Sequence, residues 1–326
     1  PNEPVSNGNF PDLPEWTFWA DEDVTATPIV YGSNVFARTS EAVYKIDANT
    51  GILIWRFASP GTSSSLDVSP QISGNLVIVP ERGALLAAVS IETGHLVWRL
   101  RSVDANRKNT GNMEIAGFTI NEGAIYIARY DWKLTSYDLE SGQKLWEANV
   151  PGRVSLYLAA DHNAIYLAAG HSLYAYDFHF GQLLWKKDMG AYITSMVENN
   201  GYLYFAFLSD TCHLAAFNLK TRQQEWQQCS ISIDNLELGY LTIAEGVLYA
   251  TDENLFAFKL STGEMLWISQ SAGPLERPIV AGDRIYVRNN ETTMFVFDTM
   301  SGDKLGHLLV QSDAAVKEQP GRNPAI

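Results

Sequence analysis

Histidine, cysteine and acidic side chains are the groups best able to bind metals or to act as acids, bases and nucleophiles. The six histidines of this 326-residue chain are scattered, and no two have the spacing that places two ligands on one metal ion. The sequence contains nothing that resembles a nucleophile elbow, a glycine-rich phosphate loop or a pair of adjacent cysteine ligands. This pattern favours a protein that is not an enzyme, and it leaves open a site assembled from residues far apart in the chain.

Three glutamates are a weaker sign of chemistry, because each stands just before a predicted strand in a different part of the chain. They are Glu114, Glu237 and Glu276. Carboxylates that converge supply the oxygen ligands that cations such as Ca²⁺ prefer. The simpler interpretation is three solvated loop ends, so the sequence predicts no metal site and keeps a cation site as the alternative.

A basic and aromatic group of residues is the best candidate for binding. It combines a polar insertion over 101–112 with a short connection over 129–133, and its members are Arg101, Arg107, Lys108, Tyr130 and Trp132. Loops commonly carry function, and tryptophan, tyrosine and arginine dominate binding surfaces. We expect this patch to bind a protein segment, a glycan or an anionic ligand. The competing interpretation, that Trp132 packs beneath the insertion, is the simpler of the two.

The two cysteines stand symmetrically about a predicted turn. The midpoint between Cys212 and Cys229, at 220.5, falls within the turn Lys220–Arg222, and residues placed in this way face each other across an antiparallel hairpin. We therefore predict a disulfide, and with it an oxidising compartment outside the cytoplasm. Two buried thiols are the alternative.

A repeat positions all of these residues. Its clearest copy is Tyr137–Trp146, and its consensus is Asp-x-x-Thr/Ser-Gly-x-x-x-Trp. The copies end at Trp55, Trp98, Trp146, Trp185, Trp226, Trp267 and Gly306, in steps of 43, 48, 39, 41, 41 and 39 residues. A fixed period of about 40 residues predicts a propeller or a solenoid.

Each repeat contains four short strand candidates separated by turn residues. In the fourth repeat they cover 155–160, 164–169, 172–177 and 182–187. Both faces of Leu173–Tyr176 are apolar, as a sheet packed between two neighbouring sheets requires. The sequence thus predicts an all-β protein, a β-propeller of four-stranded antiparallel blades. We count seven blades, and eight is the alternative if the chain ends build an irregular extra blade.

Tryptophan and the chain ends explain how the blades would hold together. Each motif tryptophan returns on the outermost strand and is expected to be buried against the next blade. Trp16 lies 39 residues before Trp55, in register with the series, whereas the last repeat has Gly306 at that position. We therefore predict that Glu15–Trp19 is a strand that lies on the seventh blade and closes the propeller.

The repeated motif resembles that of the PQQ-like, or quinoprotein-like, β-propellers, over nearly the whole chain from Trp16 to Val310. That family includes both quinoprotein dehydrogenases and proteins without a cofactor, so the resemblance implies the fold more than an activity. Its alcohol-oxidising members carry adjacent cysteines over the quinone and a bound calcium. Here the two cysteines are 17 residues apart, so we expect neither PQQ nor calcium.

Composition and the chain ends complete the expectations. The formal charge of −14 predicts a surface that repels nucleic acid and anionic membranes unless a local basic patch intervenes, and no apolar run is long enough to span a membrane. We expect a tether over 1–14, the propeller over 15–310 and a tail over 311–326. We also expect a monomer in the periplasm or at the cell surface, with a signal or lipid anchor removed from upstream of Pro1.

The favoured function is a non-enzymatic, exported bacterial propeller that acts as a protein- or ligand-binding or scaffolding module. A small quinoprotein-like oxidoreductase with an axial cofactor or cation site is one alternative. The sensor ectodomain of a longer receptor is another.

Overall fold

The protein consists of strands and turns, and the described residues contain no helix. The structure, a computed structural model, describes residues 16, 18–22, 24–59, 70–81, 84–101, 115–151, 154–209, 212–229, 238–270, 273–289 and 293–309. The predicted tether over 1–14 and tail over 311–326 lie outside these residues.

Seven four-stranded antiparallel sheets form the blades of a β-propeller, as predicted. The chain divides into two compact units, 1–105 with 308–326, and 106–307. The first unit holds blade one, β1 (Val24–Tyr31), β2 (Asn34–Thr39), β3 (Ala42–Asp47) and β4 (Leu53–Ala58), and blade two, β5 (Gln71–Ser73), β6 (Leu76–Pro80), β7 (Ala84–Ser90) and β8 (Leu96–Arg101).

The second unit holds blades three to seven. Blade three is β9 (Ile115–Asn121), β10 (Ala124–Arg129), β11 (Lys133–Asp138) and β12 (Lys144–Asn149), and blade four is β13 (Val154–Ala160), β14 (Ile165–Ala169), β15 (Ser172–Tyr176) and β16 (Leu183–Asp188). Blade five is β17 (Tyr192–Asn199), β18 (Tyr202–Leu208), β19 (Leu214–Asn218) and β20 (Gln223–Gln228). Blade six is β21 (Tyr240–Ala244), β22 (Val247–Thr251), β23 (Asn254–Lys259) and β24 (Met265–Gln270), and blade seven is β25 (Ile279–Ala281), β26 (Arg284–Arg288), β27 (Thr293–Asp298) and β28 (Lys304–Leu309), whose last two residues count with the first unit.

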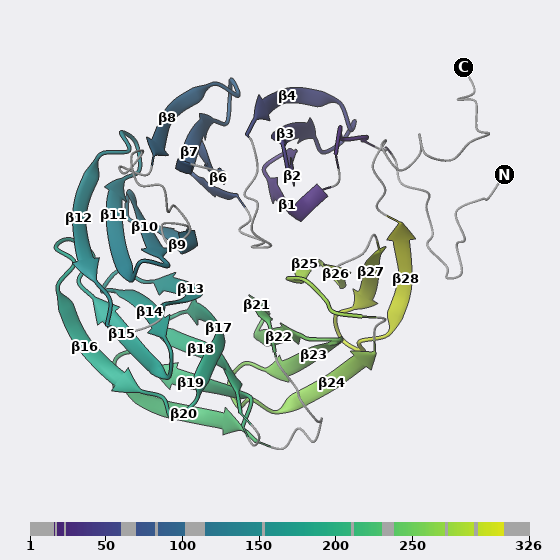
Figure 1. The fold of residues 1–326 in the computed structure, drawn as a ribbon. Helices are drawn as coiled ribbons and strands as arrows, with labels where there is room; N and C mark the ends of the chain where they lie inside the picture. Colours follow the sequence, from purple (N-terminus) through teal and green to yellow (C-terminus); the bar gives the residue numbers. More distant parts are fainter. Residues whose placement is uncertain are drawn as a thin grey trace. The chain divides into compact units, whose positions relative to one another are not determined.

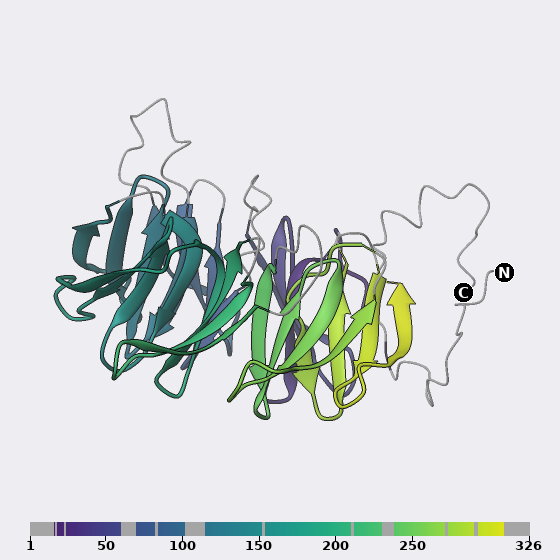
Figure 2. The ribbon, with the colours of Figure 1, turned by 90° about the horizontal axis from the view of Figure 1, so that it is seen from below.

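The strands of one blade differ in burial according to their place in the sheet. Within the second unit, Figure 1 shows the first strand of each blade on the inner side of the row and the fourth on the outer side. Figure 2 shows the same sheets from below, with the twist that β-strands adopt. All six residues of β10 are buried, whereas the outer strand β12 has only exposed and half-buried positions, which alternate along most of its length. Middle strands are therefore apolar on both faces because blades pack against both sides of them.

The turn before each outer strand has the geometry that the motif predicts. In blade three, Asp138 Oδ1 accepts hydrogen bonds from the backbone N–H of Ser141 (2.8 Å) and from its hydroxyl (2.5 Å). Gly142 follows with φ of 68°, a left-handed conformation that costs glycine little and other residues more. Next to this turn the pairing of β11 with β12 shifts register, so that Tyr137 lies opposite Lys144 and Ser136 opposite Trp146.

The motif tryptophans connect neighbouring blades. Trp146 of blade three donates its indole N–H to the carbonyl of Phe178 in blade four (3.0 Å), and its ring covers Gly181. A Cβ on Gly181 would lie 2.4 Å from Cε3 of Trp146, so the ring occupies the space that a side chain would need. Equivalent N–H bonds run from Trp55 to Ile91 (2.9 Å), from Trp226 to Leu260 (3.1 Å) and from Trp267 to Thr299 (3.2 Å).

The N-terminal tryptophan repeats this contact inside the first unit. Trp16 donates its indole N–H to the carbonyl of Ala48 (2.7 Å), and its ring lies against Gly51 as Trp55 lies against Gly94. The predicted register of Trp16 is therefore correct. The predicted strand is not seen in the described part of 15–19, because Trp16 and residues 18–22 have no strand pairing and the seventh sheet takes all four of its strands from 279–309.

Candidate functional site

The connection between β10 and β11 presents the exposed aromatic residue of the predicted patch. Trp132 is 57% exposed and adopts φ of 66°, a left-handed conformation that costs a tryptophan about 1 kcal/mol or more. Its backbone is fixed on both sides, since its N–H bonds to the carbonyl of Arg129 (3.1 Å) and its carbonyl accepts the N–H of Val150 (2.7 Å). The loop therefore holds an exposed indole in a rigid and unfavourable backbone conformation.

Charged pairs beneath this loop fix its shape. The buried guanidinium of Arg129 binds the carboxylate of Asp131, with Nε 3.0 Å from Oδ1. Lys133 bonds to Glu147 (2.5 Å), which also binds Lys144 (2.8 Å). Burial acts to raise the pKa of Glu147, but the hydrogen bonds from these two lysines outweigh it and lower the pKa to about 2. The positive charges next to Trp132 are thus paired with carboxylates.

The other members of the patch are only partly placed. Tyr130 is half-buried and packs against the apolar core that includes Tyr126 and Leu134. Arg101 ends β8 in the first unit, and its side chain is not described. Arg107 and Lys108 lie outside the described residues. That these residues form one patch with Trp132 stays a prediction.

Only one of the three predicted glutamates is described. Glu276 is 7% exposed, and both of its carboxylate oxygens bind Arg288, Oε2 at 2.9 Å from Nε and Oε1 at 2.6 Å from Nη2. Glu114 and Glu237 lie outside the described residues, which hold no group of three His, Cys, Asp or Glu side chains able to bind a metal. A cation site stays an untested prediction, and at Glu276 it competes with an arginine that the sequence did not indicate as its partner.

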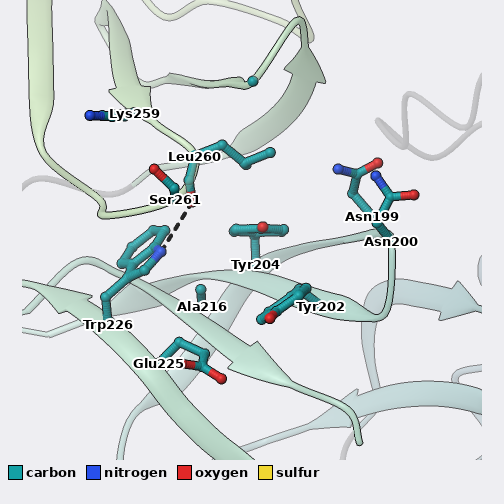
Figure 3. A pocket seen from close by; sticks show the side chains of 11 residues that line it. Asn199, Asn200, Tyr202, Tyr204, Ala216, Glu225, Trp226, Lys259, Leu260 and Ser261 are labelled. Atoms are coloured by element: carbon teal, nitrogen blue, oxygen red, sulfur yellow. Dashed lines mark hydrogen bonds between the residues drawn. The ribbon is translucent and has the colours of Figure 1, made fainter.

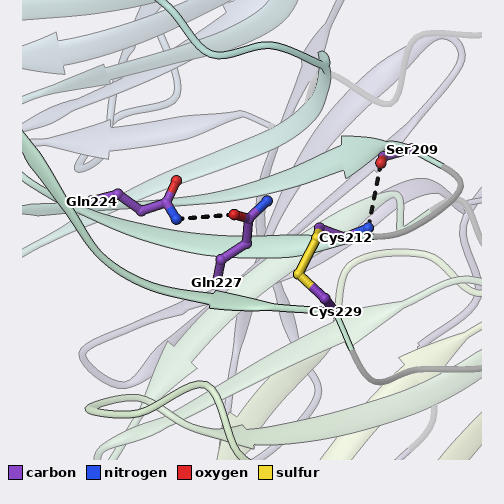
Figure 4. Close-up of a disulfide and its surroundings, with 5 residues drawn as sticks. All are labelled: Ser209, Cys212, Gln224, Gln227 and Cys229. Carbon is purple, nitrogen blue, oxygen red and sulfur yellow. Dashed lines mark hydrogen bonds between the residues drawn. A yellow bond between two sulfur atoms is a disulfide. The ribbon is translucent and has the colours of Figure 1, made fainter.

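The predicted disulfide is present. Cys212 and Cys229 are bonded, and they flank the hairpin β19–β20 at its open end (Figure 4). The two cysteines are not directly opposite in the ladder, because a register shift between Ala216 and Phe217 places Leu214 opposite Gln228. Both cysteines lie just beyond the paired strands, where the backbone can bring the two sulfurs together.

A cleft between blades five and six was not predicted. It encloses about 450 Å³ and is lined by the rings of Tyr202, Tyr204 and Trp226 from blade five and by Leu260 and Ser261 from blade six (Figure 3). Asn199 and Asn200 close one end and Lys259 lies at the other. The signal in the sequence was available, because Asn218 and Lys259 stand where most repeats have the motif aspartate.

Comparison with known proteins decides the family. The family model described as "Outer membrane protein assembly factor BamB" matches residues 13–187, 131–238 and 213–324. The chain belongs to this family of PQQ-like repeat propellers. Among its relatives, the outer membrane protein assembly factor BamB of Yersinia pestis is 24% identical over 82% of this chain and 69% of its own length.

Solved structures share the fold. BamB from Moraxella catarrhalis aligns with a TM-score of 0.63 and 16% identity, covering 90% of both chains. The quinohemoprotein alcohol dehydrogenase from Comamonas testosteroni aligns with a TM-score of 0.67 and 13% identity, covering 91% of this chain and 69% of its own. At these identities the likeness concerns the propeller and not its activity. In the part of the chain that the structure describes, no helix has the length and hydropathy needed to span a membrane.

Proposed function

We propose that the protein is a non-enzymatic propeller that binds a protein partner outside the cytoplasm, in a role related to outer membrane protein assembly. The observation that carries this proposal is the match of the assembly-factor family model from residue 13 to residue 324. The relative from Yersinia pestis carries the same name and aligns with 82% of this chain. The Cys212–Cys229 disulfide supports a place outside the cytoplasm, because cytosolic reductants keep most thiols reduced.

The β10–β11 loop is the surface that we assign to the partner. Trp132 is mostly exposed and holds a left-handed backbone conformation, and exposed aromatic residues on rigid loops are typical binding anchors. The Arg129–Asp131 pair fixes the loop before the partner arrives, so binding loses little conformational entropy.

Neither PQQ nor calcium takes part in this proposal. Its test is direct: adding PQQ with calcium to the purified protein should leave the melting temperature unchanged and should produce no dye-linked oxidation of alcohols. A saturable turnover would instead favour the quinoprotein-like oxidoreductase.

Site-specific photo-crosslinking tests the binding surface. A photoreactive phenylalanine analogue replaces Trp132 in the full chain expressed in its own host, and a matched control places it at Leu145, which is 53% exposed on β12 of the same blade. Position 132 should yield one discrete adduct in the envelope fraction, which mass spectrometry identifies, and position 145 should yield none. Equal labelling from both positions, or none from position 132, would refute the assignment.

A further inference from the structure

The cleft between blades five and six lies where the repeat departs from its own pattern. The first motif position is aspartate in four blades, at Asp47, Asp138, Asp177 and Asp298, and is Ser90 in blade two. The two blades that form the cleft have Asn218 and Lys259 there instead. Blade five has Tyr202 at a position that varies among the repeats and is alanine in blades three and four, at Ala124 and Ala164. Two adjacent blades that both replace the motif aspartate beside one cleft indicate a local role that the fold itself does not require.

Asn218 shows what its departure achieves. Its Oδ1 accepts the N–H groups of Lys220 and Thr221 (3.0 Å each), as the aspartate of other repeats does for its own turn. Its Nδ2 donates to Glu225 Oε1 (2.8 Å) and to the Tyr202 hydroxyl (3.3 Å), which a carboxylate cannot do. Asparagine therefore keeps the turn and also orients two side chains on the wall of the cleft.

The wall is a row of aromatic rings with polar groups on its rim. The ring centroids of Tyr202 and Tyr204 are 6.4 Å apart, and those of Tyr204 and Trp226 are 6.0 Å apart. Trp226 donates its N–H to Leu260, which fixes the third ring (Figure 3). The exposed side chains of Asn200 and Glu225 border this row.

We infer that this cleft binds a carbohydrate, with the C–H face of a pyranose ring on the half-buried ring of Tyr202. Polarised C–H groups of a sugar meet the negative face of an aromatic ring favourably. Sugar hydroxyls donate and accept, and the rim matches them with the amides of Asn199 and Asn200, the carboxylate of Glu225 and the hydroxyl of Ser261. Glu225 and Lys259 carry opposite charges, so the cleft offers an anion no net attraction, and an aromatic peptide side chain would leave the polar rim groups unmatched.

The repeat itself supplies the variant that removes this site and preserves the fold. Tyr202→Ala, Asn218→Asp and Lys259→Asp together restore residues that other blades carry at the same positions. The probes are maltotetraose, cellotetraose and chitotetraose, measured with the full chain by saturation-transfer NMR and tryptophan fluorescence. At least one should bind the wild-type protein saturably, and the triple variant should lose about tenfold or more in affinity with its melting temperature kept.

Two controls keep the test decisive. Asp138→Asn exchanges the same two residue types at the equivalent position of blade three and should leave sugar binding unchanged. Asn218→Asp alone should weaken sugar binding, and it replaces the triple variant in the test where the triple variant does not fold. Lack of saturable binding by all three oligosaccharides overturns the inference, as does undiminished binding by Asn218→Asp. Binding of a tyrosine-containing peptide in place of any sugar overturns it too. The cleft and the β10–β11 loop belong to different blades, so failure here leaves the proposed protein-binding function standing.

Discussion

The hairpin β11–β12 of blade three and the hairpin β19–β20 of blade five have the same backbone and different side chains. Gly142 has φ of 68° in the first, and Arg222 has φ of 56° at the same motif position in the second. A residue with a Cβ pays about 1 kcal/mol or more for this conformation. Blade five must therefore recover that cost elsewhere.

The contacts of Arg222 with blade four supply compensating interactions. In the regular interface between blades three and four, the ring of Trp146 rests on Gly181, because glycine leaves the backbone bare. In the interface between blades four and five, the guanidinium of Arg222 lies over the ring of Trp185 at 5.6 Å, and Lys187 Nζ bonds to the carbonyl of Arg222 (3.1 Å). The indole ring therefore packs against the backbone of a glycine in the first interface and against the planar guanidinium of an arginine in the second. At the end away from Arg222, the hairpin β19–β20 is crosslinked by the Cys212–Cys229 disulfide.

Removing an indole from a regular interface should have the largest effect. Trp146→Ala loses the apolar contact with Gly181 and Tyr126 and the hydrogen bond to Phe178, so we expect the free energy of unfolding to fall by about 3 to 5 kcal/mol. Denaturant unfolding followed by circular dichroism measures this loss. Trp132→Ala is the matched control, since that ring is mostly exposed and should cost less than about 0.5 kcal/mol. A loss below about 1 kcal/mol for Trp146→Ala would mean that the indole does not hold the blades together.

Removing the disulfide of the hairpin β19–β20 should cause the second largest loss in the free energy of unfolding. Replacing Cys212 and Cys229 by serine opens a loop closed over 17 residues, which the chain-entropy model values at about 3 kcal/mol. Unfolding with and without reductant measures the effect: reductant should destabilise the wild-type protein by a similar amount and leave the double variant unchanged. A wild-type protein indifferent to reductant would show that the hairpin is held by its packing alone.

The repeat explains why so much of the fold was predictable. Trp16, Trp55 and Trp146 keep their spacing because each must reach the same turn of the next blade, and a constraint repeated along the chain is visible in one sequence. The disulfide was also found, although the shift between Ala216 and Phe217 moves the cysteines out of strict opposition. The repeat period predicts which residues of neighbouring elements are in contact, but it does not predict local register shifts such as this one.

The site was harder to predict because its contacts join unrelated positions. Arg288 neutralises Glu276 from a strand 12 residues away, and no spacing rule links them. The cleft involves Asn218, which orients Tyr202 and Glu225, and Lys259, and both Asn218 and Lys259 stand where other repeats have the motif aspartate. Such departures are seen only when the copies are compared with one another position by position.

Adding a side chain at the interface between blades three and four should lower the free energy of unfolding by less than removing the indole does. Gly181→Ala places a Cβ 2.4 Å from Cε3 of Trp146 and adds the penalty of a left-handed alanine, so we expect a loss of about 2 to 3 kcal/mol. Arg222→Ala, at the same motif position in blade five, already has a tolerated Cβ and should lose only the cation–π contact, about 0.5 to 1 kcal/mol. Thermal unfolding of both variants measures the difference. Equal losses would refute the claim that the two interfaces accept different partners.

The smallest predicted effect is a difference in acid sensitivity between the Asp138 turn of blade three and the Asn218 turn of blade five. Hydrogen bonds from the hydroxyl and then the backbone N–H of Ser141 lower the pKa of Asp138 below its ordinary value. A carboxyl group whose pKa is lower in the folded state stabilises the fold fully above its unfolded pKa of about 3.9, and this contribution is lost as pH falls through the folded value.

Asn218 has no charge to lose, so the turn of blade five should not respond. Amide exchange by NMR, corrected for its intrinsic pH dependence, should show the Ser141 N–H losing protection below about pH 4 while that of Thr221 does not change. Asp138→Asn should abolish the response in blade three. Parallel loss of protection in both turns would place the acid sensitivity in the whole blade rather than in the motif carboxylate.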